Sequence, residues 1–107
     1  MTTPAKTVTR PLISMSNLRR ALADKGRWRI LDFLQQRGPM TTEFVSSATG
    51  LSRQNTSKHL VFMRDAGILE QRMGKLYAIP DAFLVSGERT IDFGAVVLRL
   101  DQAAEKK

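Results

Sequence analysis

Residues 52–60 read Ser-Arg-Gln-Asn-Thr-Ser-Lys-His-Leu, and the interpretation of the whole chain depends on this stretch. Ser52 is a suitable N-cap, because its hydroxyl can accept a hydrogen bond from an unpaired N–H in the first turn of a helix. Thr56, Leu60 and Met63 follow at spacings of four and three residues, so they share one face of that helix. The stretch therefore predicts a helix that begins after Ser52 and buries this face.

The side chains that point away from this face are polar, and none of them is acidic. They are Arg53, Gln54, Asn55, Ser57 and Lys58. Arg and Lys side chains can bind guanine edges or phosphates, and Asn and Gln can bind adenine through two hydrogen bonds. On composition alone, such a face is usually just solvated, so the neighbouring segments have to decide between the two interpretations.

The composition fits a single small domain with an anionic partner. The chain has 107 residues, of which 42% are hydrophobic, and its formal net charge is +7. A length in this range is typical of one domain, and a strong positive charge favours a polyanion such as nucleic acid.

Several classes of protein are disfavoured by what the sequence lacks. The absence of cysteine excludes disulfides, thiolate metal sites and cysteine nucleophiles. No Ser-His-Asp order, catalytic carboxylate pair, glycine-rich phosphate loop or metal motif is present, so we expect no enzyme and no cofactor. No apolar run reaches membrane length and no signal peptide is recognisable, so we expect a cytoplasmic protein without a membrane partner.

Two helices are predicted in the N-terminal part of the chain. Residues 14–25 suit a short helix with Ser14 or Ser16 as its cap, and a second helix should run from Asp24 to Gln36 before Gly38-Pro39 ends it. The residues that we expect to face inward are Met15, Leu18 and Leu22 in the first helix and Ile30, Leu31 and Leu34 in the second.

A third helix is predicted over residues 42–49, with Val45 and Ala48 facing inward. Gly50 then supplies the turn, because a tight crossing of two helices demands a glycine-like backbone conformation. Leu51 should pack beneath both helices. The third helix, this turn and the helix after Ser52 together form a helix-turn-helix.

A β-hairpin is predicted after the fourth helix, which should end at Gly67. Residues 68–79 place apolar pairs on both sides of a tight turn at Met73-Gly74. Arg72 and Lys75 lie at its tip. A small basic hairpin directly after a helix-turn-helix is typical of a wing, whose tip meets phosphates or the adjacent minor groove. The alternative is that both residues are ordinary solvated turn charges.

The C-terminal part is ambiguous between strand and helix. Residues 90–100 have a helical apolar spacing but also strong strand propensity, and we favour a strand in which Gly94 forms a bulge. In either form the segment carries an apolar surface that closes the core or binds a second subunit. The predicted fold is α+β and mostly helical, a winged helix-turn-helix with a two-stranded wing. Its predicted parts are a flexible basic arm (1–13), a DNA-binding domain (14–80), and a packing or dimerisation segment with a charged tail (81–107).

Taken together, these elements resemble the ArsR-type family of winged helix-turn-helix transcriptional regulators over roughly residues 18–80. The motifs that carry the resemblance are Leu22-Ala23-Asp24, Arg27-Trp28-Arg29-Ile30-Leu31, Gly50-Leu51-Ser52, Ser57-Lys58-His59-Leu60 and Met63-Arg64-Asp65-Ala66-Gly67-Ile68-Leu69. The resemblance implies a homodimer that binds an inverted repeat in double-stranded DNA and represses transcription. In many such proteins a metal ion or another effector releases the DNA, and the sequence names no effector here.

The chain departs from the metal-sensing members of that family. Where those members carry a Cys-x-Cys pair at the third helix, this chain has Thr41 and Glu43. A second family site uses histidine and carboxylates, whereas here only Asp92, Asp101 and Glu105 are available. Carboxylates alone suit hard cations, so we expect no bound metal and no thiolate metal sensing.

We assign the candidate contact residues from these elements. Base edges in the major groove should be read by Gln54, Asn55 and Ser57. Phosphates should be bound by Ser52, Arg53, Lys58, Arg72, Lys75, Arg19 and Arg20. His59 and Trp28 are expected to be structural.

Two other functions stay open at this point. The chain is expected to be a sequence-specific, dimeric repressor, but a winged helix can also serve as a protein-interaction module, for which an exposed Phe44 would be a sign. A nonspecific architectural protein that binds DNA or RNA is the other alternative, because the net charge alone would support it.

Overall fold

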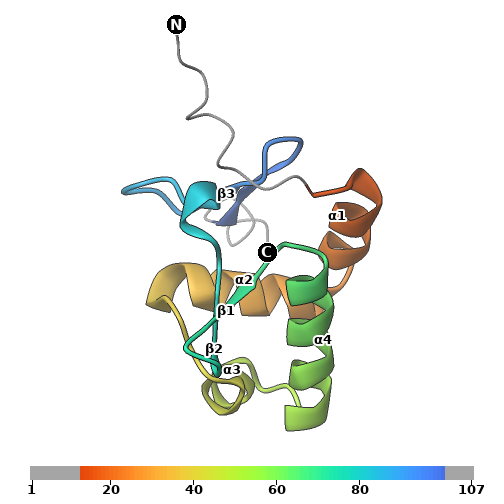
Figure 1. The fold of residues 1–107 in the computed structure, drawn as a ribbon, viewed down its shortest axis with the longest axis vertical. Helices are drawn as coiled ribbons and strands as arrows, with labels where there is room; N and C mark the ends of the chain where they lie inside the picture. Colours follow the sequence, from red (N-terminus) through yellow and green to blue (C-terminus); the bar gives the residue numbers. More distant parts are fainter. Residues whose placement is uncertain (1–12, 101–107) are drawn as a thin grey trace, which may run out of the picture.

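The computed structural model describes residues 13–100, so residues 1–12 of the predicted arm (1–13) and the predicted tail (101–107) lie outside the described residues. Its helices are α1 (Met15–Leu22), α2 (Lys25–Arg37), α3 (Thr42–Thr49) and α4 (Arg53–Asp65). They are followed by β1 (Glu70–Arg72), β2 (Leu76–Ala78), the 3-10 helix η2 (Asp81–Phe83), β3 (Thr90–Asp92) and β4 (Val97–Arg99) (Figure 1). The mostly helical α+β fold and its wing are confirmed.

Each helix begins at a residue whose side-chain oxygen accepts a hydrogen bond from the first turn. The caps are Ser14 on α1, Asp24 on α2, Thr41 on α3 and Ser52 on α4. The turn between α3 and α4 uses Gly50 at a φ of 80°, a left-handed conformation that favours glycine. These local signals fix where the two helices of the helix-turn-helix start and stop.

The core lies where α4 crosses α1 and α2. Leu60 and Met63 of α4 are fully buried, together with Ile30 and Leu31 of α2. Thr56 is also fully buried, so the inward residues predicted for the helix after Ser52, which is α4, are confirmed. The outer face of its first two turns is left to solvent by this packing.

Thr56 places a hydroxyl in this core without a hydrogen-bond partner. A buried polar group that loses water and gains no partner destabilises the folded state. We expect Thr56→Val, which has the same shape, to raise the free energy of unfolding by about 1–2 kcal/mol. Urea denaturation with an unchanged m-value would measure this. A loss of stability instead would show that the hydroxyl has a partner.

The wing consists of β1 and β2, paired antiparallel with Gln71 opposite Tyr77. Its two turn residues, Met73 and Gly74, both have positive φ values, of 52° and 78°. They belong to a three-residue loop, because the strands pair Arg72 with Leu76, and loops of this length use a left-handed residue. Met40, between α2 and α3, exchanges two backbone hydrogen bonds with Tyr77, of 3.0 and 2.8 Å. The wing is therefore attached directly to the helix-turn-helix.

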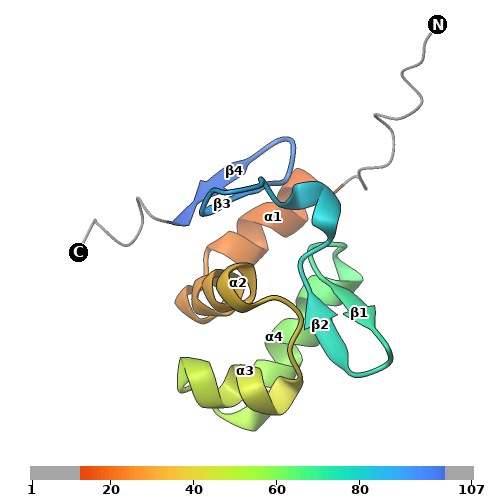
Figure 2. The ribbon, with the colours of Figure 1, turned by 90° about the vertical axis from the view of Figure 1, so that its left-hand side faces the viewer.

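The C-terminal segment forms a second hairpin, β3–β4, that covers α1 and α2 at the end of the molecule away from the wing (Figure 2). The preference for strand is confirmed, but the predicted bulge is wrong. Gly94 lies in the turn between the strands at a φ of 96°. Its N–H donates to the Asp92 carboxylate over 2.9 Å, a side-chain turn that reverses the chain at this point.

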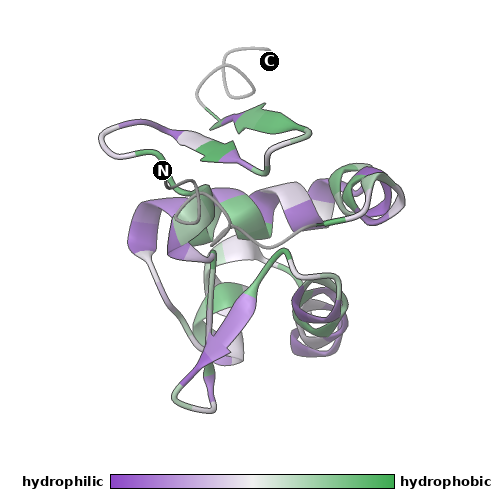
Figure 3. Cartoon of the chain, turned by 45° about the horizontal axis from the view of Figure 1, so that its top comes forward, coloured by the Kyte–Doolittle hydropathy of each residue, from purple (hydrophilic) through white to green (hydrophobic). Residues whose placement is uncertain are grey.

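The second hairpin closes the core. Phe83 and Ile91 are fully buried, and the Phe83 and Phe93 rings meet edge to face at 5.3 Å. Arg89 binds Asp32 and Gln35 of α2, which fixes the hairpin against that helix. Figure 3 shows the contrast with the wing, whose strand β1 is hydrophilic along its length, while β3 and β4 carry apolar residues.

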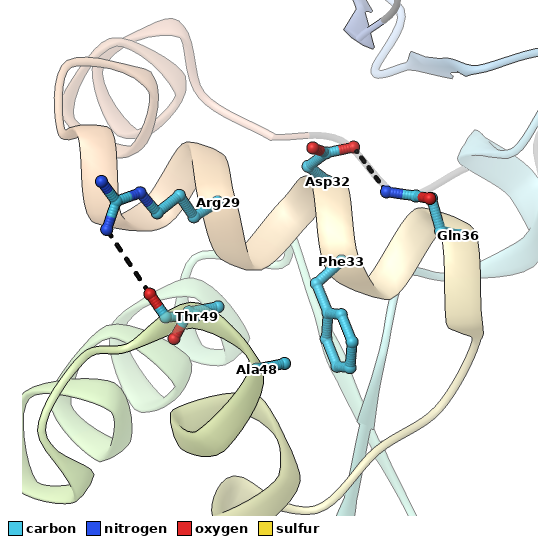
Figure 4. A pocket seen from close by; sticks show the side chains of 6 residues that line it. All are labelled: Arg29, Asp32, Phe33, Gln36, Ala48 and Thr49. Atoms are coloured by element: carbon cyan, nitrogen blue, oxygen red, sulfur yellow. Dashed lines mark hydrogen bonds between the residues drawn. The ribbon is translucent and has the colours of Figure 1, made fainter. Parts of the chain in front are cut away.

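Two residues that we expected to face inward do not. Met15 is 45% exposed, because it is the first residue of an eight-residue helix and lies beyond the core. Ala48 is exposed at the rim of a cleft of about 330 Å³ between α2 and α3, opposite Phe33 (Figure 4). Its methyl group is too short to fill that space.

Candidate nucleic-acid interface

The first two turns of α4 present an exposed polar surface. Gln54, Asn55, Ser57 and Lys58 are all exposed, and the buried Thr56 and Leu60 hold the opposite side of the helix in the core. This surface contains no acidic side chain of its own. The structure thus brings together the three predicted base-reading residues and Lys58. The hydroxyl of Ser52 is already engaged, because it accepts the Asn55 N–H over 3.1 Å.

Arg53, at the start of α4, is paired across the helix-turn-helix with an acid of α3. Its Nη2 lies 2.7 Å from Glu43 Oε2, and both side chains are largely exposed. Sequence reasoning counted Arg53 as a free cation and missed this pair. The two residues are ten positions apart, so the contact follows from how α3 crosses α4.

The two basic residues of the wing have different surroundings. Lys75 is exposed at the tip, beside Gly74. Arg72 binds Glu70 Oε2 at 2.6 Å and Asp81 Oδ1 at 3.3 Å. The hydrogen bond that Arg72 donates to the Glu70 carboxylate is the main reason why the pKa of Arg72 is raised. Lys75 is consequently the available cation of the wing, whereas Arg72 is held by two carboxylates.

Arg19 and Arg20 lie on α1, which stands beside the C-terminal half of α4. The Arg20 guanidinium stands 4.8 Å from the centre of the Phe62 ring, and Arg27 approaches the same ring at 4.6 Å. Arginine above an aromatic face is a favourable cation–π arrangement. These cations flank the C-terminal half of α4, away from the predicted base-reading residues.

His59 connects α4 to the start of α2. Its Nδ1 accepts a hydrogen bond from Arg27 Nε at 3.1 Å, and its Nε2 lies 3.6 Å from Asp24 Oδ2. Burial is the main reason why the pKa of His59 is lowered, and Asp24 opposes that shift. The pKa of Asp24 is itself lowered, chiefly by the Arg27 N–H. These contacts join α4 to the start of α2, which is consistent with the structural role predicted for His59.

The contact between α2 and α4 leaves little room for a side chain at Gly26. A Cβ on Gly26 would lie 2.9 Å from Asp24 Oδ2 and 3.3 Å from His59 Nε2. The absence of a side chain at this position lets the N-terminus of α2 pack against the flank of α4. The exposed surface of α4 is therefore supported from behind at a fixed orientation.

The cleft between α2 and α3 is a poor candidate for a binding site, because its charged residues are already bonded within the protein (Figure 4). Arg29 donates to the carbonyl of Thr49 at 3.4 Å. Asp32 accepts from Gln36 and from Arg89. We assign it no ligand.

Thr41 and Glu43 stand where the metal-sensing members of the resembled family carry thiols, and both side chains have other partners. Thr41 uses its hydroxyl to cap α3, accepting from Phe44 N–H at 3.3 Å, and Glu43 is paired with Arg53. Within residues 13–100, no three His, Cys, Asp or Glu side chains gather as a metal site would require. The helices of this part of the chain are also too short or too polar to cross a membrane.

Comparison with known proteins agrees with this geometry. Residues 22–72 match a family model described as a helix-turn-helix domain, and no curated protein sequence matches the chain. The chain is similar to the homodimeric winged helix-turn-helix DNA-binding domain of Mb0332 from Mycobacterium bovis, a possible ArsR-family transcriptional regulator. The identity is 30% and the TM-score 0.53, over 60% of this chain and 61% of that one, which is less than two thirds of its length.

A second solved structure has the same fold. The chain is similar to the AntR antimony-specific transcriptional repressor with 24% identity and a TM-score of 0.53, over 77% of this chain and 84% of that one. The first structure is described as a possible transcriptional regulator and the second as a transcriptional repressor. The family match covers α2, α3, α4 and β1, and the likeness to both structures shows a shared fold. This chain therefore has a winged helix-turn-helix fold and is similar to a possible ArsR-family transcriptional regulator.

Proposed function

We propose that this protein is a DNA-binding regulator of transcription that recognises a specific operator sequence. The observation that carries the proposal is the acid-free polar surface of Gln54, Asn55, Ser57 and Lys58, exposed on the first two turns of α4. An α-helix fits the major groove, and amides and hydroxyls placed near its N-terminus can reach base edges there. The fixed contact of α4 with α2 supports this role, because base reading requires a well-placed helix.

The proposed contacts divide into two kinds. Gln54, Asn55 and Ser57 read bases, because their side chains can form the hydrogen bonds that distinguish base pairs. Lys58, Lys75, Arg53 and Ser52 contact phosphates around the same surface. Arg19 and Arg20 would reach the backbone only where the DNA extends along α1. Arg72 contributes less, because Glu70 and Asp81 already bind it.

The protein is proposed to act in the cytoplasm as a homodimeric repressor on an inverted repeat. The Mb0332 domain is homodimeric, and AntR is a repressor. Two copies related by a twofold axis would place two α4 helices in successive major grooves, about one helical turn apart. Since the chain has no cysteine, we propose that thiolate-bound metals do not control its binding.

Selection of duplex DNA from a random pool tests the proposal. We expect an inverted repeat with half-sites about one turn apart to be recovered. Titrations at several salt concentrations should then show tighter binding to that site than to random duplex. Salt-sensitive binding without any preferred sequence would instead support the architectural role. Absence of binding would favour the protein-interaction role, for which Phe44, 62% exposed, offers a contact.

Lys75→Ala tests the wing. We expect this variant to weaken binding to every duplex alike, because a phosphate contact carries no sequence information, and to reduce the salt slope by about one. Arg99→Ala is the matched control, because Arg99 is an exposed cation on β4, at the opposite end of the molecule (Figure 2). A slope that is the same for both variants would remove the wing from the contacts.

A further inference from the structure

A groove between α3, α4 and the wing brings charges of both signs together. Its volume is about 460 Å³. Thr42 and Glu43 of α3 form one wall, Arg53 of α4 lies beside them, and Gly74 and Lys75 of the wing form the opposite wall. In Figure 2, α3 and the wing tip lie at the same end of the molecule. The groove thus adjoins the surface proposed to read bases.

The two cations of this groove differ in how they are paired. The Arg53 guanidinium is bound by the Glu43 carboxylate, with 2.7 Å between Nη2 and Oε2. Lys75 forms no salt bridge with any residue of the described range 13–100. Both side chains of the Arg53–Glu43 pair are open to solvent, with 70% and 62% of their surface exposed. Another anion can therefore reach Arg53 without moving the backbone.

We propose that this groove binds one backbone phosphate of DNA, and that the Glu43 carboxylate occupies the Arg53 side of it in the free protein. The inference rests on the DNA-binding function proposed above. Carboxylate and phosphate both offer a pair of anionic oxygens that a guanidinium binds through parallel N–H groups. Glu43 is thus a competitor of the phosphate, and Arg53 and Lys75 are the two cations that line the groove.

The competition has a defined consequence for recognition. An exposed ion pair is weak and screened by salt, so a phosphate can displace the carboxylate. The displaced carboxylate still lies near the phosphate and repels it. This repulsion reduces affinity for all sequences equally, so the contacts of α4 with bases become a larger part of the total binding. Glu43 is therefore expected to limit nonspecific binding.

Glu43 also lies in the first turn of α3, where a negative charge interacts favourably with the helix dipole and stabilises the helix. A role confined to helix stability would change the melting temperature of the protein and leave the salt dependence of DNA binding unaltered. The salt dependence consequently separates the two roles, because it counts the cations that neutralise phosphates.

The test compares wild-type protein with Glu43→Gln on a selected duplex and on a random duplex, by fluorescence anisotropy at several salt concentrations. Glutamine keeps the size of the side chain and removes its charge. We expect affinity for both duplexes to rise by about three- to tenfold and the salt slope to steepen by about one, because Arg53 then contributes fully. In an Arg53→Gln background the same substitution should leave the slope unchanged.

Asp65→Asn is the matched control, because it removes the same charge from an exposed acid that is paired with Arg64 at the far end of α4. Equal effects of Glu43→Gln and Asp65→Asn on affinity and slope would overturn the inference and leave the proposed function standing. Binding of duplex DNA by Glu43→Gln, when neither wild type nor Asp65→Asn binds it, would support the inference. If neither wild type nor any variant binds a duplex, the proposed function fails, and the phosphate site fails with it.

Discussion

Replacing Phe83 with alanine should lower the free energy of unfolding by about 3–5 kcal/mol, because it removes a large buried ring and leaves a cavity. Phe83 is fully buried and meets Phe93 edge to face at 5.3 Å. Folded domains are stable by only about 5–15 kcal/mol, so this loss would be a large share of the total. Guanidinium denaturation of both proteins measures it.

The matched control for this variant is Phe44→Ala. Phe44 has the same ring, but 62% of it is exposed, so we expect a change within about 0.5 kcal/mol. The comparison shows whether η2 and the second hairpin belong to the same cooperative unit as the helix-turn-helix. A loss below 1 kcal/mol for Phe83→Ala would mean that the C-terminal hairpin unfolds independently.

Replacing Gln54 or Asn55 with alanine should weaken binding to the selected operator by about 1–3 kcal/mol, or roughly 5- to 150-fold. Affinity for random duplex should change little. The reason is that a side-chain amide forms two hydrogen bonds with one base and fewer with others, so its loss matters only where that base is present. Titration of both variants against operator and random duplex gives the two affinities directly.

Gln36→Ala is a suitable control, because Gln36 is an exposed amide on α2 whose side chain bonds Asp32. It should leave both affinities unchanged. If Gln54→Ala and Asn55→Ala reduce binding to random DNA as much as to the operator, these residues contact the backbone. Base reading would then have to be assigned to Ser57 or to contacts outside α4.

Local signals in the sequence predicted most of the fold. The four capping residues and the glycine between α3 and α4 act through their own backbone neighbours, so they can be recognised without any tertiary information. The buried face of α4 followed from spacing alone. The turn at Gly94 was missed, although Asp92 two residues earlier is a usual partner for such a turn.

The charged contacts could not be predicted in the same way. Arg53 meets Glu43 across the helix crossing, and Arg27 meets His59 from a position 32 residues away. Such pairs depend on the angle between helices, which is set by the packing of many side chains together. The sequence therefore identified the cations near the candidate surface, but the structure was needed to separate Lys75, which is free of ion pairs within residues 13–100, from the paired Arg53 and Arg72.

The two hydrogen bonds between Met40 and Tyr77 make the wing and the helix-turn-helix one stiff body. The distance between Lys75 and the exposed face of α4 is then fixed by the fold and does not adjust to the DNA. A duplex whose grooves do not match that distance must itself bend or twist, at a cost that depends on the stiffness of its base steps. On the proposed function, the protein would select operators by their mechanical properties, including at base pairs that it does not touch.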